Sequence, residues 1–163
     1  MFDALLSSIQ IGFAPHLVAL IFAYALALPI GWDREHEERS AGIRTFPLVA
    51  IASCGFIQAA EAHFSDSDEA LARITEGIIA GMGFIGGGAI LRMKTSVRGT
   101  ATAASLWATG AVGVAVGLGS YDVAFLLSLL TFITLKMLKP LKAEQNGDAA
   151  DDGDARKDDG AKE

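Results

Sequence analysis

The stretch PHLVALIFAYALALPIGW, residues 15–32, decides the fold class because it contains no acidic residue, lysine or arginine. As an α-helix it would rise about 27 Å, close to the roughly 30 Å of hydrocarbon in a bilayer. A peptide backbone in lipid must satisfy its own hydrogen bonds, so the stretch is expected to be helical. The sequence therefore predicts a membrane-spanning helix here.

Four more apolar stretches of similar length follow along the chain. They cover residues 46–62, 72–91, 100–118 and 121–137. Together with the first stretch they predict an all-α integral membrane protein, a bundle of about five transmembrane helices within residues 1–142. A very apolar soluble bundle is the alternative, but five such helices would leave it almost no polar surface.

The lysines and arginines of the connecting segments alternate in number along the chain. From the N-terminus onward the successive segments carry 0, 3, 1, 3, 0 and 3 of them. Because cytoplasmic segments of membrane proteins are enriched in these residues, the pattern predicts an outside N-terminus and a cytoplasmic C-terminus. The first residues lack the basic region of a cleavable signal peptide, so we expect none.

Most of the net charge of −6 lies in residues 143–163, which hold eight acids and three bases. This segment contains no apolar residue larger than alanine, and it is predicted to be a disordered cytoplasmic tail. The rest of the chain is nearly neutral, which excludes a basic nucleic-acid-binding protein. A single cysteine, Cys54, excludes an intramolecular disulfide and a cysteine-based zinc site.

Glycines four residues apart recur in the third and fourth apolar stretches. Small residues at this spacing share a helix face and let two backbones approach closely, so we expect these two helices to form the tightly packed centre. A second interpretation is that residues 86–88 unwind locally and line an ion path. The helix-packing candidates are Gly77, Gly81, Gly83, Gly86, Gly87, Gly88, Gly113 and Gly117.

The segment after the first predicted helix, residues 33–45, holds three arginines and four acids. Arginine offers a planar fork of donors that carboxylates accept in pairs. One interpretation is an ion-pair network that joins the ends of the first two helices to the arginines below the next two. The other is a contact for a cytoplasmic or membrane partner. The candidate residues are Asp33, Arg34, Glu35, Arg39, Arg44, Arg92 and Arg98.

The predicted outer face is acidic, and Glu76 lies within the third stretch. An ionisable residue inside a membrane span is costly and therefore suggests function. One interpretation pairs Glu76 with Arg73 near the outer interface, and the other gives it a cation- or proton-responsive role in the bundle interior. Glu61 and Glu76 are weak candidates for a loose magnesium site, since Mg²⁺ binds through one or two carboxylates and waters. Solubility of the outer face is the plain alternative.

No catalytic constellation is present in the sequence. The histidines His16, His36 and His63 lie in or beside different predicted helices, and there is no phosphate-binding loop or zinc-protease helix. The sequence therefore predicts a protein that is not an enzyme and that needs no cofactor.

Four short motifs lie in order along the chain, at residues 31–35, 39–45, 81–92 and 97–107. They read GWDRE, RSAGIRT, GMGFIGGGAILR and VRGTATAASLW. Together they resemble the MgtC/SapB family of bacterial inner-membrane proteins, over about residues 15–140. The resemblance implies a bundle of about five helices, a link to magnesium-limited growth and, in some pathogens, survival inside macrophages. It also implies that the charged residues of the first two motifs rank above Glu76, where members often have glutamine.

Two classes of function follow for a multi-pass protein of the inner (plasma) membrane. In the first, the protein regulates magnesium and acid-stress adaptation through partner membrane proteins such as the F-type ATP synthase, which the resemblance implies. In the second, it is itself a small channel or carrier for Mg²⁺ or another cation. A homodimer is expected, because its interface would bury the glycine faces. Under the first class, charge reversal at Arg34 or Glu35 should abolish partner capture without unfolding the bundle.

Overall fold

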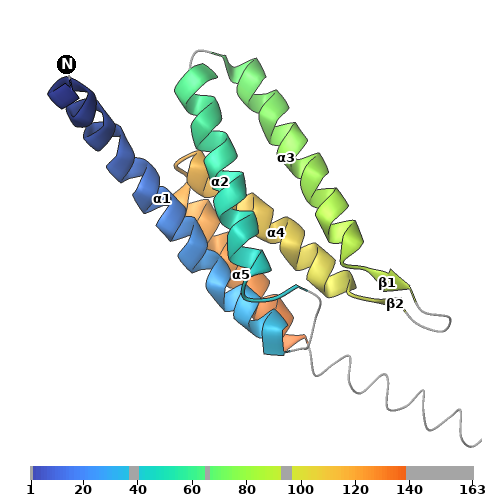
Figure 1. Cartoon of the computed structure of the whole chain (residues 1–163). Coiled ribbons are helices and arrows are strands. Elements are labelled where there is room, and N and C mark those ends of the chain that lie inside the picture. The colour runs from blue at the N-terminus through green and yellow to red at the C-terminus, as the bar shows by residue number, and fades with distance from the viewer. Residues whose placement is uncertain (1, 37–40, 65–66, 93–96, 139–163) are drawn as a thin grey trace, which may run out of the picture. The chain divides into compact units, whose positions relative to one another are not determined.

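The structure is a computed structural model of the chain, and it describes residues 2–36, 41–64, 67–92 and 97–138. The described residues form five helices and one two-stranded hairpin (Figure 1), which confirms the all-helical class. The elements are α1 (Phe2–His36), α2 (Thr45–Phe64), α3 (Asp68–Gly88), β1 (Leu91–Arg92), β2 (Val97–Arg98), α4 (Thr100–Gly117) and α5 (Tyr121–Met137).

Three segments of the described residues are long and apolar enough, by length and composition, to cross a membrane. They are Phe13–His36 in α1, Thr45–Phe64 in α2 and Thr100–Gly117 in α4. The other two helices were also expected to span. However, α3 carries four charged residues in its first nine, and α5 has 17 residues. The number of spans and their orientation therefore stay predictions.

Helix α4 lies at the centre of the packing, because buried residues cover most of its circumference, with Trp107 on the exposed side. Leu106, Val112 and Val116 are almost fully buried, and so are the hydroxyl-bearing Thr102 and Thr109. A helix that is apolar on every side is one that neighbours surround. Helices α1, α2 and α3 all contact α4. On α1 the buried face is a stripe of small residues, Ala19, Ala23 and Ala27, that lets the helix approach closely.

The closest backbone approach is between α4 and α2, at Gly113 and Gly117. A Cβ added at Gly113 would lie 2.3 Å from the carbonyl oxygen of Ala50, and one at Gly117 would lie 2.7 Å from Cβ of Ile57. Both distances are well below van der Waals contact, so only glycine fits. These two glycines therefore pack α4 against α2, whereas we had expected α3 as the partner.

Helix α3 contacts α4 through fewer of its glycines than expected. A Cβ at Gly86 would lie 3.2 Å from the carbonyl oxygen of Ala103, and the side chain of Met82 fills the space beside Gly110. The other five candidates have nothing within 4 Å of an added Cβ: Gly77, Gly81, Gly83, Gly87 and Gly88. Residues 86–88 are helical in the structure, which does not show the local unwinding of the second interpretation.

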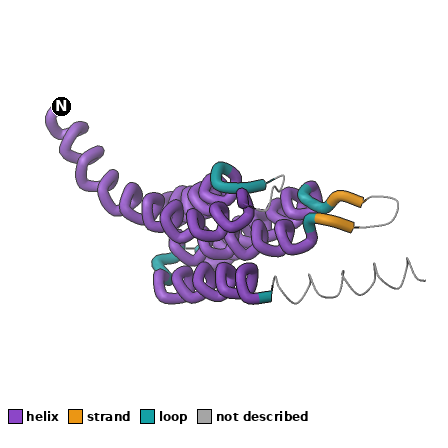
Figure 2. Tube along the Cα trace, turned by 90° about the horizontal axis from the view of Figure 1, so that it is seen from below, coloured by secondary structure: helices purple, strands orange, loops and turns teal. Residues whose placement is uncertain are grey.

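The connection between α3 and α4 is a hairpin that the sequence analysis did not predict. Leu91 pairs with Arg98 and Arg92 with Val97 in an antiparallel ladder (Figure 2). Residue Leu91, expected at the end of the third span, thus lies in β1. Gly99 connects β2 to α4 and has a φ of +91°. A Cβ there would lie 2.0 Å from the carbonyl oxygen of Ala89, so this position requires glycine.

Helix α5 is tied to α1 by two side-chain contacts. The Ser128 hydroxyl donates to the carbonyl oxygen of Leu26 at 2.7 Å, and the rings of Phe22 and Tyr121 meet edge-on at 5.4 Å.

Contacts divide the chain into two compact units, Met1–Phe132 and Ile133–Glu163. The predicted acidic tail, residues 143–163, lies outside the described residues.

The substitution Gly113→Ala tests the packing of α2 on α4. We expect it to lower the free energy of unfolding by about 1–3 kcal/mol, because a backbone carbonyl faces the new methyl group and one helix must move. The measurement is chemical unfolding in detergent micelles, followed by the far-UV circular dichroism of the helices.

The matched control is Gly83→Ala, since an added Cβ at that helical position meets open space. It should leave stability unchanged or raise it by a few tenths to about 1 kcal/mol through helix propensity. Equal stability of the two variants would contradict the packing role of Gly113.

Candidate functional site

The candidate site is the junction between the end of α1 and the start of α2, which carries two of the four motifs. The carbonyl oxygen of Gly42 accepts hydrogen bonds from the backbone N–H groups of Thr45 and Phe46, at 2.9 and 3.2 Å. These bonds begin α2. The Glu35 carboxylate, on the last turn of α1, accepts the backbone N–H of Ile43 at 3.1 Å. A side chain of one helix thus holds the start of the next.

Two glycines allow the two segments of the junction to meet. A Cβ at Gly42 would lie 1.8 Å from Oε2 of Glu35 and 3.2 Å from its Cα. A Cβ at Gly31 would lie 3.1 Å from Cα of Ile43. Close approach of α1 to the incoming chain therefore explains why glycine stands at both positions. This role of Gly42 and of the Ile43 N–H was not predicted, although both residues lie within the motif at residues 39–45.

Arg34 is the buried charge of the junction, with 4% of its surface exposed. Its guanidinium donates from Nε to Oδ2 of Asp33 at 3.1 Å, and Nη2 pairs with the same carboxylate oxygen. A buried charge of this kind is tolerated because it is paired and hydrogen-bonded. The burial of Arg34 argues against the expectation that charge reversal there would spare the fold, because a buried residue is not a surface contact.

Two other arginines of the candidate ion-pair network, Arg44 and Arg98, form no ion pair with described residues. Both side chains are exposed. Arg39 and the side chain of Arg92 lie outside the described residues. Within the described ranges the junction thus joins α1 to α2, and no ion pair links it to Arg98 of the α3–α4 connection.

The acidic candidates lie on exposed surface. Arg73 pairs with Glu69 at 2.8 Å, one helical turn before it, rather than with Glu76 as in one of the two interpretations. Glu76 is exposed and lines an open pocket beside Asp68, and Glu61 does not line that pocket. The part of the chain that the structure describes contains no group of three or more potential metal ligands. A magnesium site at Glu61 and Glu76 therefore stays a hypothesis.

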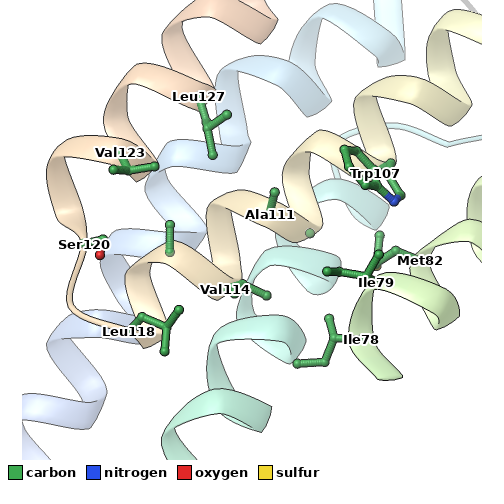
Figure 3. A pocket seen from close by; sticks show the side chains of 12 residues that line it. Ile78, Ile79, Met82, Trp107, Ala111, Val114, Leu118, Ser120, Val123 and Leu127 are labelled. Carbon is green, nitrogen blue, oxygen red and sulfur yellow. The ribbon is translucent and has the colours of Figure 1, made fainter. Parts of the chain in front are cut away.

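An apolar pocket of about 270 Å³ lies where α3, α4 and α5 meet. Figure 3 shows Ile79 and Met82 of α3, Trp107 of α4 and Leu127 of α5 around it. Two buried hydroxyls of α4 donate to carbonyls of their own helix. Ser105 donates to the Thr102 carbonyl at 3.0 Å, and Thr109 donates to the Ser105 carbonyl at 2.8 Å. The hydrogens of these two hydroxyls are thus satisfied by carbonyls of the preceding turn.

Comparison with known proteins identifies the family. The profile of the MgtC family matches residues 20–144, which include the junction and the α3–α4 connection. The chain belongs to the MgtC family. This confirms the membership that the four motifs indicated.

Three relatives of this MgtC family chain cover most of its length. An uncharacterized protein of Synechocystis sp. is 36% identical over 125 residues, which are 77% of this chain and 53% of the relative. Protein MgtC of Salmonella typhimurium is 37% identical over 116 residues, 71% of this chain and 49% of the relative. Protein SrpB of Synechococcus elongatus is 34% identical over 135 residues, 76% of this chain and 74% of the relative.

The chain spans about half the length of the first two relatives. No solved structure matches it.

The variants Arg34→Glu and Arg98→Glu test the division of the arginines into buried and exposed ones. Arg34→Glu should lower the free energy of unfolding by about 3 kcal/mol or more, because it buries a second carboxylate beside Asp33. Arg98→Glu should change stability by less than about 0.5 kcal/mol, since its side chain is exposed. Thermal unfolding in detergent micelles measures both. A stable Arg34→Glu protein would contradict the structural role of Arg34.

Proposed function

We propose that this MgtC family protein is a multi-pass inner-membrane protein that regulates adaptation to magnesium limitation and acid stress by contact with partner membrane proteins. The observation that carries the proposal is the exposed guanidinium of Arg98, in the hairpin between α3 and α4. Because Arg98 has no ion-pair partner among the described residues, it is available to a carboxylate of another protein. The partner we propose is the F-type ATP synthase, which the family resemblance implies.

The packing of the described bundle supports contact rather than conduction. Most buried positions on α2 and α4 are filled by apolar side chains such as Phe46, Ile57 and Leu106, and the buried polar residues of these helices carry only hydroxyl groups: Ser53, Thr102, Ser105 and Thr109. The buried charged side chain of the described residues, Arg34, lies at the end of α1 and is already paired. An ion crossing a single copy would need polar groups along its path, since an unpaired charge in hydrocarbon is costly.

The proposed complex includes a second copy of the chain. Gly83 and Gly87 lie four residues apart on α3, and an added Cβ at either meets nothing within 4 Å. Membrane helices associate through small residues at this spacing, because the backbones can then approach closely. We therefore assign this face of α3 to a homodimer contact.

The substitution Arg98→Glu tests the proposed partner contact. In vesicles that hold the purified chain together with F-type ATP synthase, we expect the wild-type chain to change ATP-driven proton pumping. The Arg98→Glu chain should lose most of that effect, because a like charge replaces the attractive one. A pH-sensitive dye measures the pumping, and chemical crosslinking measures capture of the synthase.

The control for this experiment is a vesicle with the chain alone, an internal magnesium dye and an imposed gradient and potential, compared with protein-free vesicles. We expect no protein-dependent magnesium flux. Flux from the chain alone would overturn the regulatory proposal in favour of a small channel or carrier. Glu61 and Glu76 would then be the first residues to substitute.

The substitution Gly83→Leu tests the dimer. It should abolish crosslinked dimers in membranes, because the larger side chain separates the two helices. Gly81→Leu is the matched control, since residues two apart lie about 200° apart around a helix. Dimers that survive Gly83→Leu would place the contact on another face.

A further inference from the structure

A second, larger groove of about 860 Å³ lies between α2 and α3. Its walls are mostly apolar, and several of the side chains that line it are strongly exposed: Leu48 and Phe56 at 61% and Phe84 at 86%. In Figure 1 the two helices are joined at one end and separate toward the other. In a membrane protein, an exposed apolar groove of this kind faces lipid.

The α3 wall of the groove is shaped by two glycines. Gly77 and Gly81 both line it, and a Cβ added at either would meet nothing within 4 Å. Side chains at these positions would fill the groove, so their absence leaves room for a chain-like apolar group between α2 and α3.

The length of the groove along its two helices is close to the thickness of one leaflet of a bilayer. On α2 its lining runs from Thr45 to Phe56, which corresponds to a rise of about 16 Å. On α3 it runs from Ile74 to Ile85, a similar rise. Half of the hydrocarbon thickness is roughly 15 Å. A spanning helix of a second protein would need a groove about twice as long, whereas one acyl chain fits a groove of this length.

The positively charged side chain of Arg44 lies at one end of the groove. Arg44 lines the groove beside Thr45, just ahead of α2, and it forms no ion pair with any described residue. The lining residues include no acid. Guanidinium binds phosphate oxygens in pairs, and basic pockets between membrane helices bind anionic headgroups. The charge at this end therefore complements a negatively charged headgroup.

We propose that the groove between α2 and α3 binds one anionic phospholipid, with its phosphate at Arg44 and an acyl chain along Gly77 and Gly81. The site requires only that α2 and α3 lie in the bilayer. It does not depend on the proposed regulatory role, so either can fail without the other.

Native mass spectrometry of the full chain, released from detergent, tests the headgroup contact. The protein is incubated with dioleoyl-phosphatidylglycerol or dioleoyl-phosphatidylcholine, which share acyl chains and differ in net charge. We expect one phosphatidylglycerol bound per chain, with about tenfold preference over phosphatidylcholine, as one charge-assisted contact would give. Arg44→Gln should remove that preference, and Arg98→Gln, a matched exposed arginine outside the groove, should retain it.

The acyl-chain contact is tested by Gly81→Leu against Gly83→Leu. Both positions are open in the structure, but only Gly81 lines the groove. Gly81→Leu should lose most of the bound phosphatidylglycerol and keep the dimer, and Gly83→Leu should keep the lipid. If Gly81→Leu fails to fold, crosslinking of a photoreactive phosphatidylglycerol to α2 and α3 of the wild-type chain replaces it.

Three results would overturn the proposal. The first is equal binding of the two lipids by the wild-type chain. The second is equal loss of phosphatidylglycerol from Arg44→Gln and Arg98→Gln. The third is a Gly81→Leu chain that becomes monomeric with its lipid binding unchanged, which would mean that a second copy occupies the groove.

Discussion

The backbone of α4 lies against the backbone of α2 at Gly113, where not even a methyl group would fit. In lipid the hydrophobic effect does not drive helices together, so van der Waals contact between close backbones supplies much of the association. Gly117 repeats the contact one turn later, beside Ile57. This pair of approaches makes α2 and α4 the frame on which the other helices are arranged.

The placement of the other helices follows from that frame. Helix α1 packs against α2 and α4 through its alanine stripe, and the Glu35–Ile43 hydrogen bond fixes its end to the start of α2. Helix α3 meets α4 at Gly86 but has few buried residues. Between α2 and α3 a groove stays open, because Gly77 and Gly81 of α3 carry no side chain to fill it.

The helical class, the family and the approximate helix ranges could all be predicted from the sequence, because hydrophobic length and motif order are local properties. Which helices would pair could not. The spacing of Gly113 and Gly117 predicts a close approach but not its partner, and the spacing within α3 is the same whether its glycines are packed or open. The β1–β2 hairpin was missed because its strands are only two residues long. The pairing of Arg73 was missed because both Glu69 and Glu76 lie within reach on one helix face.

The charged residues of the motifs also fall into two groups, paired and exposed, that their spacing in the sequence could not reveal. Asp33, Arg34 and Glu35 stand next to one another in sequence, and all three are engaged within the α1–α2 junction. Arg44 and Arg98 belong to the same set of motifs, yet both side chains are exposed. A buried, paired guanidinium is costly to remove and is out of reach of another molecule, whereas an exposed one can exchange water for a phosphate or a carboxylate. The motifs therefore combine residues that hold the helices together with exposed residues, and it is to the second group that we assign the proposed contacts with other molecules.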